Sequence, residues 1–206
     1  MRRRIFAATL AAGLLALCTP VSDTWAQAAP PARVRGTIAA VDGKMLSVNS
    51  RDGQKVEIVL NEPLTVMTVK NVDLASVGTG TYIGTATRTL PGGVLQALEV
   101  LVFPEAMRGA AEGHFPWDLE PGSMMTNATV TGVVQSNAGR ELKLKFKDDS
   151  NAVVVPPGVP VVTLVPGQRA DLKPGAKLFL SATRNPEGQL VTSRVTVEKD
   201  GIAPPM

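Results

Sequence analysis

Short stretches of alternating apolar and other residues, most of them ending at glycine, aspartate or proline, constrain the fold of this chain more than any other feature. Residues 34–40 alternate in this way, and Asp42-Gly43 follows them. This pair favours a tight turn, because glycine adopts a positive φ at little cost. Similar stretches recur along most of the chain, almost without helical periodicity. The sequence therefore predicts an all-β barrel or sandwich. We expect Pro63 to break the strand pattern that begins at Lys55.

The pattern occurs twice. A V-x-G-x-[IV] strand, an Asp-Leu…Gly element and an Ala-Thr-Arg strand follow one another in the same order in each half of the chain. Motifs repeated in order at nearly constant offset indicate an internal duplication. We interpret Asp73 and Asp171 as turn residues that cap a crossing of the barrel end. The matched segments are 34–38 with 130–134, 73–78 with 171–175, and 86–88 with 182–184.

The N-terminus has the features of an export signal. Arg2, Arg3 and Arg4 precede the apolar run 5–17, and Ala26-Gln27-Ala28 provides a cleavage site. The apolar run is shorter than the about 20 residues that a spanning helix needs. We favour a cleaved signal over residues 1–28, in preference to lipidation at Cys18 or export through the twin-arginine route.

Removal of the signal changes the charge of the protein and its cysteine chemistry. The full chain carries a formal net charge of +3, and loss of three arginines and Asp23 lowers it to +1. A nearly neutral protein is not suited to tracking polyanions. Cys18, the only cysteine, leaves with the signal, so neither disulfides nor thiolate chemistry is expected. With one histidine in the chain, most nucleophile–base pairs cannot be built, and we expect no enzyme.

These features together resemble a family of exported bacterial proteins of unknown function with tandem OB-like β-barrel domains. The resemblance covers about Val34 to Glu198, and the first copy departs from the second by an extra residue between Leu74 and Gly78. It implies an export signal at residues 1–28, one OB-like barrel at 33–103 and another at 127–200. An irregular segment at 104–126 would join the two barrels.

This central segment, residues 104–126, holds the chemically distinctive side chains. A first interpretation is a copper site, because imidazole and thioether ligands suit Cu(I), which is handled outside the cytoplasm. Glu112 or Asp118 would then fix the imidazole tautomer. The candidate ligands are His114, Met107, Met124 and Met125.

A second interpretation makes the central segment an ordered clasp, and we prefer it because the spacing matches no established metal motif. Phe115 and Trp117 would insert their rings against one barrel or between the two, and the Trp117 ring N–H would need a partner. Asp118 and Glu120 would face outward. A hydrolase that uses His114 with Glu112 or Asp118 is the competing enzymatic hypothesis.

Lys143, Lys145 and Lys147 alternate with Leu142, Leu144 and Phe146, which predicts a strand with a basic face. The interpretation we favour is a solvated strand that lysine protects from aggregation, rather than a binding face for an anionic polymer. Nucleic-acid binders of this fold add exposed aromatic rings, and Phe146 alternates inward here. We therefore exclude nucleic acid as a partner.

The sequence predicts an exported, periplasmic or secreted, non-enzymatic binding or scaffolding protein of the cell envelope. The expected partner is an oligosaccharide or an envelope protein, because OB-like barrels present concave faces. The alternative is a periplasmic copper-binding protein that uses the central segment. We expect no membrane span.

Overall fold

The computed structural model describes residues 31–136 and 139–205, and the expected export signal lies outside this part. The described chain is built from strands and short 3-10 turns, which confirms the all-β prediction. None of its helices is long and apolar enough to cross a membrane. The strands are β1 (Ala32–Asp42), β2 (Met45–Ser50), β3 (Lys55–Asn71), β4 (Tyr82–Thr89), β5 (Leu95–Ala97), β6 (Val100–Val102), β7 (Gly113–Pro116), β8 (Met124–Ser136), β9 (Gly139–Phe146), β10 (Asp149–Val155), β11 (Val161–Pro166), β12 (Lys177–Arg184) and β13 (Leu190–Val197), and the 3-10 turns are η1 (Leu74–Ser76), η2 (Glu105–Met107) and η3 (Arg169–Asp171).

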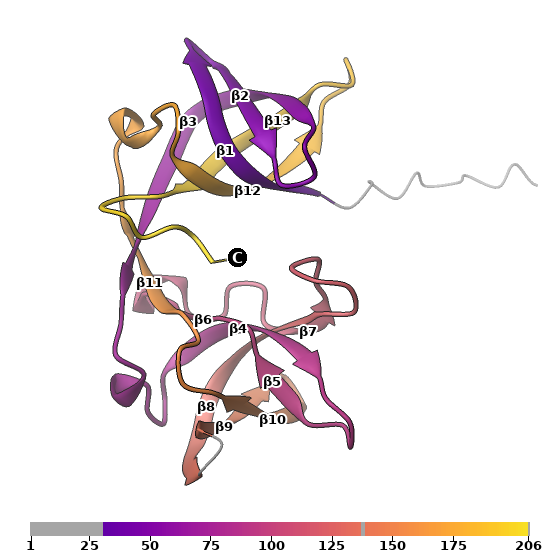
Figure 1. Ribbon diagram of the computed structural model, residues 1–206, viewed down its shortest axis with the longest axis vertical. Coiled ribbons are helices and arrows are strands. Elements are labelled where there is room, and N and C mark those ends of the chain that lie inside the picture. Colours follow the sequence, from indigo (N-terminus) through magenta and orange to yellow (C-terminus); the bar gives the residue numbers. More distant parts are fainter. Residues whose placement is uncertain (1–30, 137–138, 206) are drawn as a thin grey trace, which may run out of the picture.

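The first ring of strands closes in the order β1-β2-β3-β13-β12, with β12 returning to β1 (Figure 1). All of its pairs are antiparallel except β3–β13, which is parallel. Alternate side chains of each strand point inward and form one core. The buried core residues are Val34, Ile38, Leu46, Val48, Ile58, Leu60, Val66, Leu172, Leu178, Leu180, Ala182, Val195 and Val197.

The second ring has the same order, β8-β9-β10-β5-β4, with β4 returning to β8 and β5–β10 as its parallel pair. In β9 the residues Leu142, Leu144 and Phe146 are buried, as predicted from the alternation. The buried core residues of this ring are Val77, Ile83, Ala97, Val100, Ala128, Val130, Leu142, Leu144, Phe146, Val153, Val155 and Val161.

Each ring therefore combines strands from both halves of the chain. Strands β1–β3 close with β12 and β13, whereas β4 and β5, which come from the same half as β1–β3, close with β8–β10. A tandem arrangement of two consecutive barrels at residues 33–103 and 127–200 is thus not confirmed. The two rings exchange their last two strands, and Figure 1 shows the resulting upper and lower lobes.

Strand β3 is longer than the sequence pattern predicts and runs beyond the first ring. The sequence predicts that the strand breaks at Pro63. In the structure it continues to Asn71 and leaves the first ring. Pro63 lies where the β3–β13 pairing shifts, between Leu60, opposite Thr192, and Thr65, opposite Arg194. Its missing N–H therefore removes no bond from that pairing.

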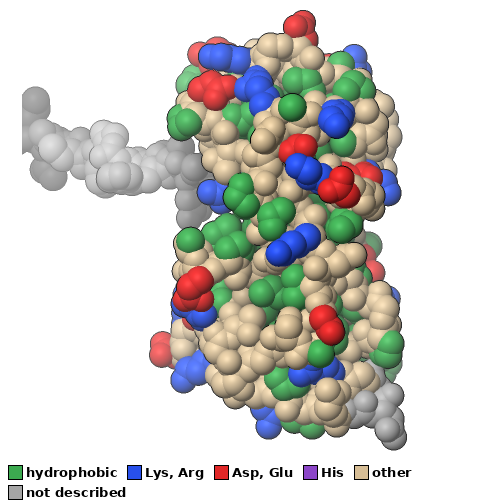
Figure 2. Space-filling model, turned by 90° about the vertical axis from the view of Figure 1, so that its left-hand side faces the viewer, with side chains coloured by type: hydrophobic (Ala, Val, Ile, Leu, Met, Phe, Trp, Pro, Cys, Tyr) green, Lys and Arg blue, Asp and Glu red, His purple; other side chains and the backbone are tan. Residues whose placement is uncertain are grey.

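Beyond the first ring, the end of β3 pairs with β11, which returns from the second ring, and β11 also pairs with β6. These strands form the waist of the molecule, where a third apolar cluster of Val69, Leu101, Val162 and Leu164 lies. On the face drawn in Figure 2, hydrophobic side chains gather at this waist between the two lobes.

Local contacts explain two residues of the repeated motifs, Gly36 and Asp73. Gly36 of the first V-x-G strand packs so closely on β2 that a Cβ would lie 2.2 Å from the Asn49 carbonyl oxygen. At Gly132, the matching position, a Cβ would meet only the Lys143 side chain, at 3.4 Å. Asp73 caps η1 by accepting a bond from the Ala75 N–H at 2.8 Å, which agrees with its interpretation as a turn residue.

Candidate ligand-binding cleft

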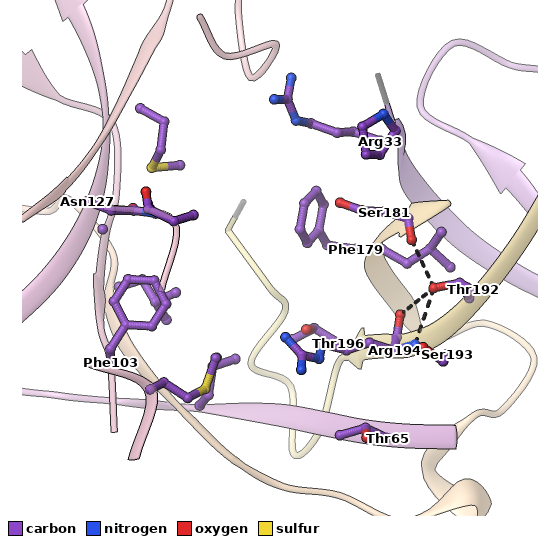
Figure 3. A pocket seen from close by; sticks show the side chains of 18 of the residues that line it. Arg33, Thr65, Phe103, Asn127, Phe179, Ser181, Thr192, Ser193, Arg194 and Thr196 are labelled. Atoms are coloured by element: carbon purple, nitrogen blue, oxygen red, sulfur yellow. Dashed lines mark hydrogen bonds between the residues drawn. The ribbon is translucent and has the colours of Figure 1, made fainter. Parts of the chain in front are cut away.

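A cleft of about 760 Å³ lies between the two rings (Figure 3). This volume falls within the roughly 300–1,000 Å³ typical of small-molecule sites. Strands β1, β3, β12 and β13 of the first ring form one wall, and the waist, the central segment and β8 form most of the other. The lining residues are Pro31, Arg33, Pro63, Thr65, Gly84, Leu101, Phe103, Met107, Ala111, Phe115, Trp117, Met125, Asn127, Leu164, Phe179, Leu180, Ser181, Thr183, Val191, Thr192, Ser193, Arg194 and Thr196.

Four aromatic rings line the cleft, and each is only half-buried. Trp117 lies between two of the others. Its ring centre is 6.1 Å from that of Phe115, in an edge-on arrangement, and 6.1 Å from that of Phe179 on β12. Phe103 follows β6 on the opposite wall, where Met107 and Met125 also line the cleft. Half-exposed rings gathered around one cavity are typical of sites that bind apolar surface.

The polar groups of the cleft belong mostly to the first ring. The guanidinium groups of Arg33 and Arg194 point into the space between the walls (Figure 3). The Thr192 hydroxyl donates hydrogen bonds to the carbonyl oxygens of Ser181 at 2.8 Å and Arg194 at 3.0 Å, both within the first ring. On the other wall, the Asn127 amide donates to the carbonyl oxygens of Ala110 and Ala111 at 3.3 and 3.2 Å. No carboxylate, histidine or lysine is among the lining residues given above.

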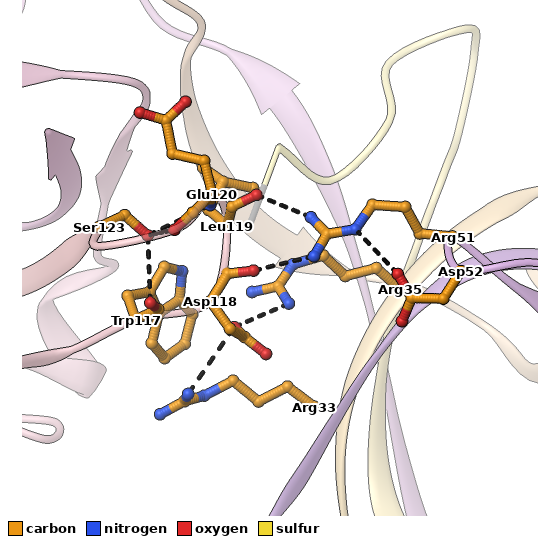
Figure 4. Close-up of polar contacts among 9 residues, drawn as sticks. All are labelled: Arg33, Arg35, Arg51, Asp52, Trp117, Asp118, Leu119, Glu120 and Ser123. Atoms are coloured by element: carbon orange, nitrogen blue, oxygen red, sulfur yellow. Dashed lines mark hydrogen bonds and ion pairs between the residues drawn. The ribbon is translucent and has the colours of Figure 1, made fainter.

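The central segment reaches the cleft because it docks on the first ring. Asp118 forms an ion pair with Arg35 of β1 at 2.9 Å and lies 3.7 Å from Arg33 (Figure 4). Arg51 donates to the backbone carbonyls of Asp118 and Leu119 at 2.9 and 2.8 Å. The guanidinium of Arg33 also stacks on Trp117, 4.0 Å from the ring centre.

The docking refines one expectation. Asp118 and Glu120 are expected to face outward, and their side chains are 46% and 36% exposed, but each also forms an ion pair, Asp118 with Arg35 and Glu120 with Arg88 at 3.6 Å. A tight turn determines their direction: the Trp117 N–H donates to the Ser123 carbonyl at 2.8 Å, and the Ser123 hydroxyl binds the Glu120 carbonyl at 2.8 Å. The segment therefore forms a folded loop that presents Trp117 and Asp118 to β1.

Buried polar groups lie close behind this contact. Glu99, between β5 and β6, is 1% exposed, and neither carboxylate oxygen has a partner within the described residues. Burial raises the pKa of Glu99 to about 8, opposed in part by the positive charge of Arg35. Burial also lowers the pKa of Arg35, while Asp118 opposes this effect. The Nε and Nη2 atoms of Arg35 and the Trp117 ring N–H are likewise buried without a described partner.

The four candidate copper ligands are not brought to one place. In the β7–β8 pair His114 lies opposite Thr126 and Phe115 opposite Met125, so alternation puts His114 and Met125 on opposite faces. Met125 and Met107 line the cleft. His114 is exposed, and its Nδ1 lies 2.8 Å from the Thr126 hydroxyl and 3.3 Å from the Asn151 amide nitrogen. In the described chain no three His, Cys, Asp or Glu side chains form a group that could hold a metal ion.

The predicted basic face lies away from the cleft. Lys143 and Lys145 are exposed on β9, and Lys147 follows the end of the strand, where its backbone N–H donates to the Glu112 carboxylate at 2.9 Å. Their inward neighbours fill the core of the second ring. The three lysines therefore occupy a solvated outer face.

Comparison with protein-family models, with curated proteins and with solved structures finds no match to this chain. The candidate site therefore rests on its own geometry. Of the lining residues, the sequence singled out Met107, Phe115, Trp117 and Met125 but not Arg33, Phe103, Phe179 or Arg194. Asp118, also singled out, lies outside the lining and pairs with Arg33 and Arg35. The alternation of β12 could have placed Phe179 opposite Leu178 and Leu180, but nothing local in the sequence shows that β12 faces the central segment.

Proposed function

We propose that this protein is an exported, non-enzymatic binding protein and that the cleft between its rings holds a ligand. The observation that carries the proposal is a cleft of small-molecule size in which half-buried aromatic rings face two arginines. Clefts of this kind, mostly apolar with few polar groups, are typical of small-molecule binding sites. Because the lining residues offer neither histidine nor carboxylate as a base, they support binding rather than catalysis.

We further propose that the two rings are OB-like barrels that arose by internal duplication. When β1-β2-β3-β13-β12 is matched to β8-β9-β10-β5-β4, both rings have the same spatial order of strands, and the parallel pair, β3–β13 or β10–β5, lies at the same place in each. This agrees with a small five-stranded Greek-key barrel. The repeated motifs lie at matching places, since Gly36 is in β1 and Gly132 is in β8, and these two strands occupy equivalent positions in the two rings. The shared order supports the duplication, and the exchange of strands explains how the cleft comes to lie between two such barrels.

The experiment for the proposed function fills the cleft. Ser181→Trp places a large ring on the cleft face of β12, opposite Arg33. Gln135→Trp, on an exposed position of β8 outside the lining, is the matched control. Native mass spectrometry of protein purified from a periplasmic fraction, before and after addition of the low-mass fraction of an envelope extract, should show a bound small molecule. We expect the adduct in the original protein and in the control but not in Ser181→Trp. An adduct kept in Ser181→Trp, or no adduct in any form, would contradict the proposal.

A further inference from the structure

The cleft is asymmetric in charge. Its positive groups, Arg33 and Arg194, come from β1 and β13 of the first ring, and no acidic side chain is among the lining residues. The opposite wall is largely apolar, formed by Phe103, Met107, Met125 and their neighbours. A ligand that fills the cleft therefore meets cations on one side and apolar surface on the other.

Within the described residues, Arg194 has no charged partner and Arg33 shares its only one. The Arg194 guanidinium takes part in no ion pair or hydrogen bond within residues 31–136 and 139–205. Arg33 lies 3.7 Å from Asp118, but that carboxylate is nearer to Arg35, at 2.9 Å. Arg33 and Arg35 thus share one carboxylate, which leaves a positive charge beside the cleft in addition to that of Arg194.

The guanidinium groups also have suitable geometry for an anion. Both point from their strands toward the middle of the cleft (Figure 3). A guanidinium presents its N–H donors as a planar fork that matches a carboxylate or a phosphate. Arg33 is held in direction by its stacking on Trp117 at 4.0 Å, so its orientation does not depend on the ligand.

We infer that the cleft binds an amphipathic anion, whose carboxylate or phosphate head lies at Arg33 and Arg194 and whose apolar body packs against the opposite wall. This inference rests on the proposed function and specifies its ligand class. Neither half of the ligand suffices: a small anion would leave the aromatic rings solvated, and an uncharged apolar molecule would leave the arginines without an anion in a partly desolvated site. The carboxylate and phosphate arms of the test identify the head.

Isothermal titration calorimetry with four probes below their aggregation concentrations tests the ligand class. Decanoate and decyl phosphate carry both parts, decanol lacks the charge, and acetate lacks the apolar body. We expect at least one of the two charged chains to bind at least about 10-fold more tightly than decanol or acetate, and to lose affinity as salt is added.

Variants locate the head. Arg194→Gln and Arg33→Gln should each weaken binding of the charged chain by about 10-fold. Arg194→Lys should restore part of this loss, because the charge returns without the planar fork of donors. Arg184→Gln is the matched control: it lies on β12 outside the lining, where it donates to the Gly188 carbonyl, and it should bind as the original protein does. Thermal unfolding of each variant checks that it is folded.

The outcomes separate this inference from the proposed function. Equal binding of decanol and the charged chains, unaffected by Arg194→Gln, would overturn the anionic head while leaving a cleft that binds apolar ligands. A small molecule retained in the cleft in mass spectrometry, with no binding of any probe, would overturn the ligand class alone. Failure of both experiments would remove the cleft as a binding site.

Discussion

Arg35 on β1 and Asp118 in the central segment form an ion pair of 2.9 Å that joins the parts of the chain before β4 and after β5, the two strands that close the second ring. The Arg35 side chain is 9% exposed, whereas that of Asp118 is 46% exposed. The pair therefore has one buried and one accessible partner. It fixes the loop that carries Trp117 and so determines the shape of one wall of the cleft.

Loss of the carboxylate should therefore loosen the central segment. We expect Asp118→Asn to lower the free energy of unfolding by about 1 kcal/mol, because Arg35 keeps its charge while losing its charged partner. The difference should shrink as salt is added, since Asp118 is partly exposed. Urea denaturation measures both effects. Asp52→Asn is the control, because its side chain is 81% exposed and 4.0 Å from Arg51, and an equal loss in this control would contradict a specific role for Asp118.

The two V-x-G glycines should respond differently to alanine. In Gly36→Ala the new Cβ would meet backbone atoms of Asn49 and Ser50 that cannot move away without breaking the β1–β2 pairing. We expect a loss of about 2–3 kcal/mol in the free energy of unfolding. In Gly132→Ala the contact is with the flexible Lys143 side chain, and a change within about 0.5 kcal/mol is expected. Chemical denaturation of the pair compares them directly, and equal losses would count against the backbone contact as the cause.

The strands were predictable because alternation and turn residues are local signals. The turn expected at Asp42-Gly43 joins β1 to β2 through Gly43 and Lys44, and the inward positions of β9 are those that the alternation predicts. The sequence around a strand does not show which distant strand it pairs with. Nothing near Tyr82 distinguishes a return to β1 from the observed pairing of β4 with β8, because both offer a similar half-buried surface.

The candidate site was predictable only in its central segment for the same reason. Phe115, Trp117 and Asp118 lie in the segment whose residue types differ most from those of the repeated strands. The clasp interpretation therefore included them. Their docking partners, Arg33 and Arg35, look like ordinary polar positions of an alternating strand. Glu99 gives no signal in the sequence, since its burial depends on the packing of both rings.

Glu99 should make stability depend on pH. Its folded pKa of about 8 lies above the ordinary value of 4.5. Between these values the unfolded chain releases the proton and the folded chain keeps it, so folding stability falls as pH rises from about 4.5 to about 8. The slope reaches at most about 1.4 kcal/mol per pH unit. Glu99→Gln should lose this component and gain stability relative to the original protein toward pH 8.

Urea denaturation from pH 4 to 9 measures this difference. Glu187→Gln, on an exposed turn between β12 and β13, serves as the control and should keep the original profile. Parallel profiles for Glu99→Gln and the original protein across the window would show that the carboxyl group does not remain protonated in the fold.

Export should leave a defined N-terminus. If residues 1–28 are a cleaved signal, the intact mass of protein from a periplasmic fraction should correspond to a start near Gln27 or Ala29. A mass that includes Cys18 with an attached lipid would favour the lipoprotein alternative. Recovery of the complete chain in the cytosol would refute export.

A cut in the central segment should not separate the two lobes. A protease site inserted after Gly109, which is exposed and follows η2, divides the chain into one fragment with β1–β6 and another with β7–β13. Each ring needs strands from both fragments, so we expect them to stay together in size-exclusion chromatography after cleavage and to part only in denaturant. Expressed alone, each fragment lacks two or three strands of either ring and should show a disordered far-UV circular dichroism spectrum. Two separately folded fragments that no longer associate would instead establish consecutive barrels and overturn the exchange of strands.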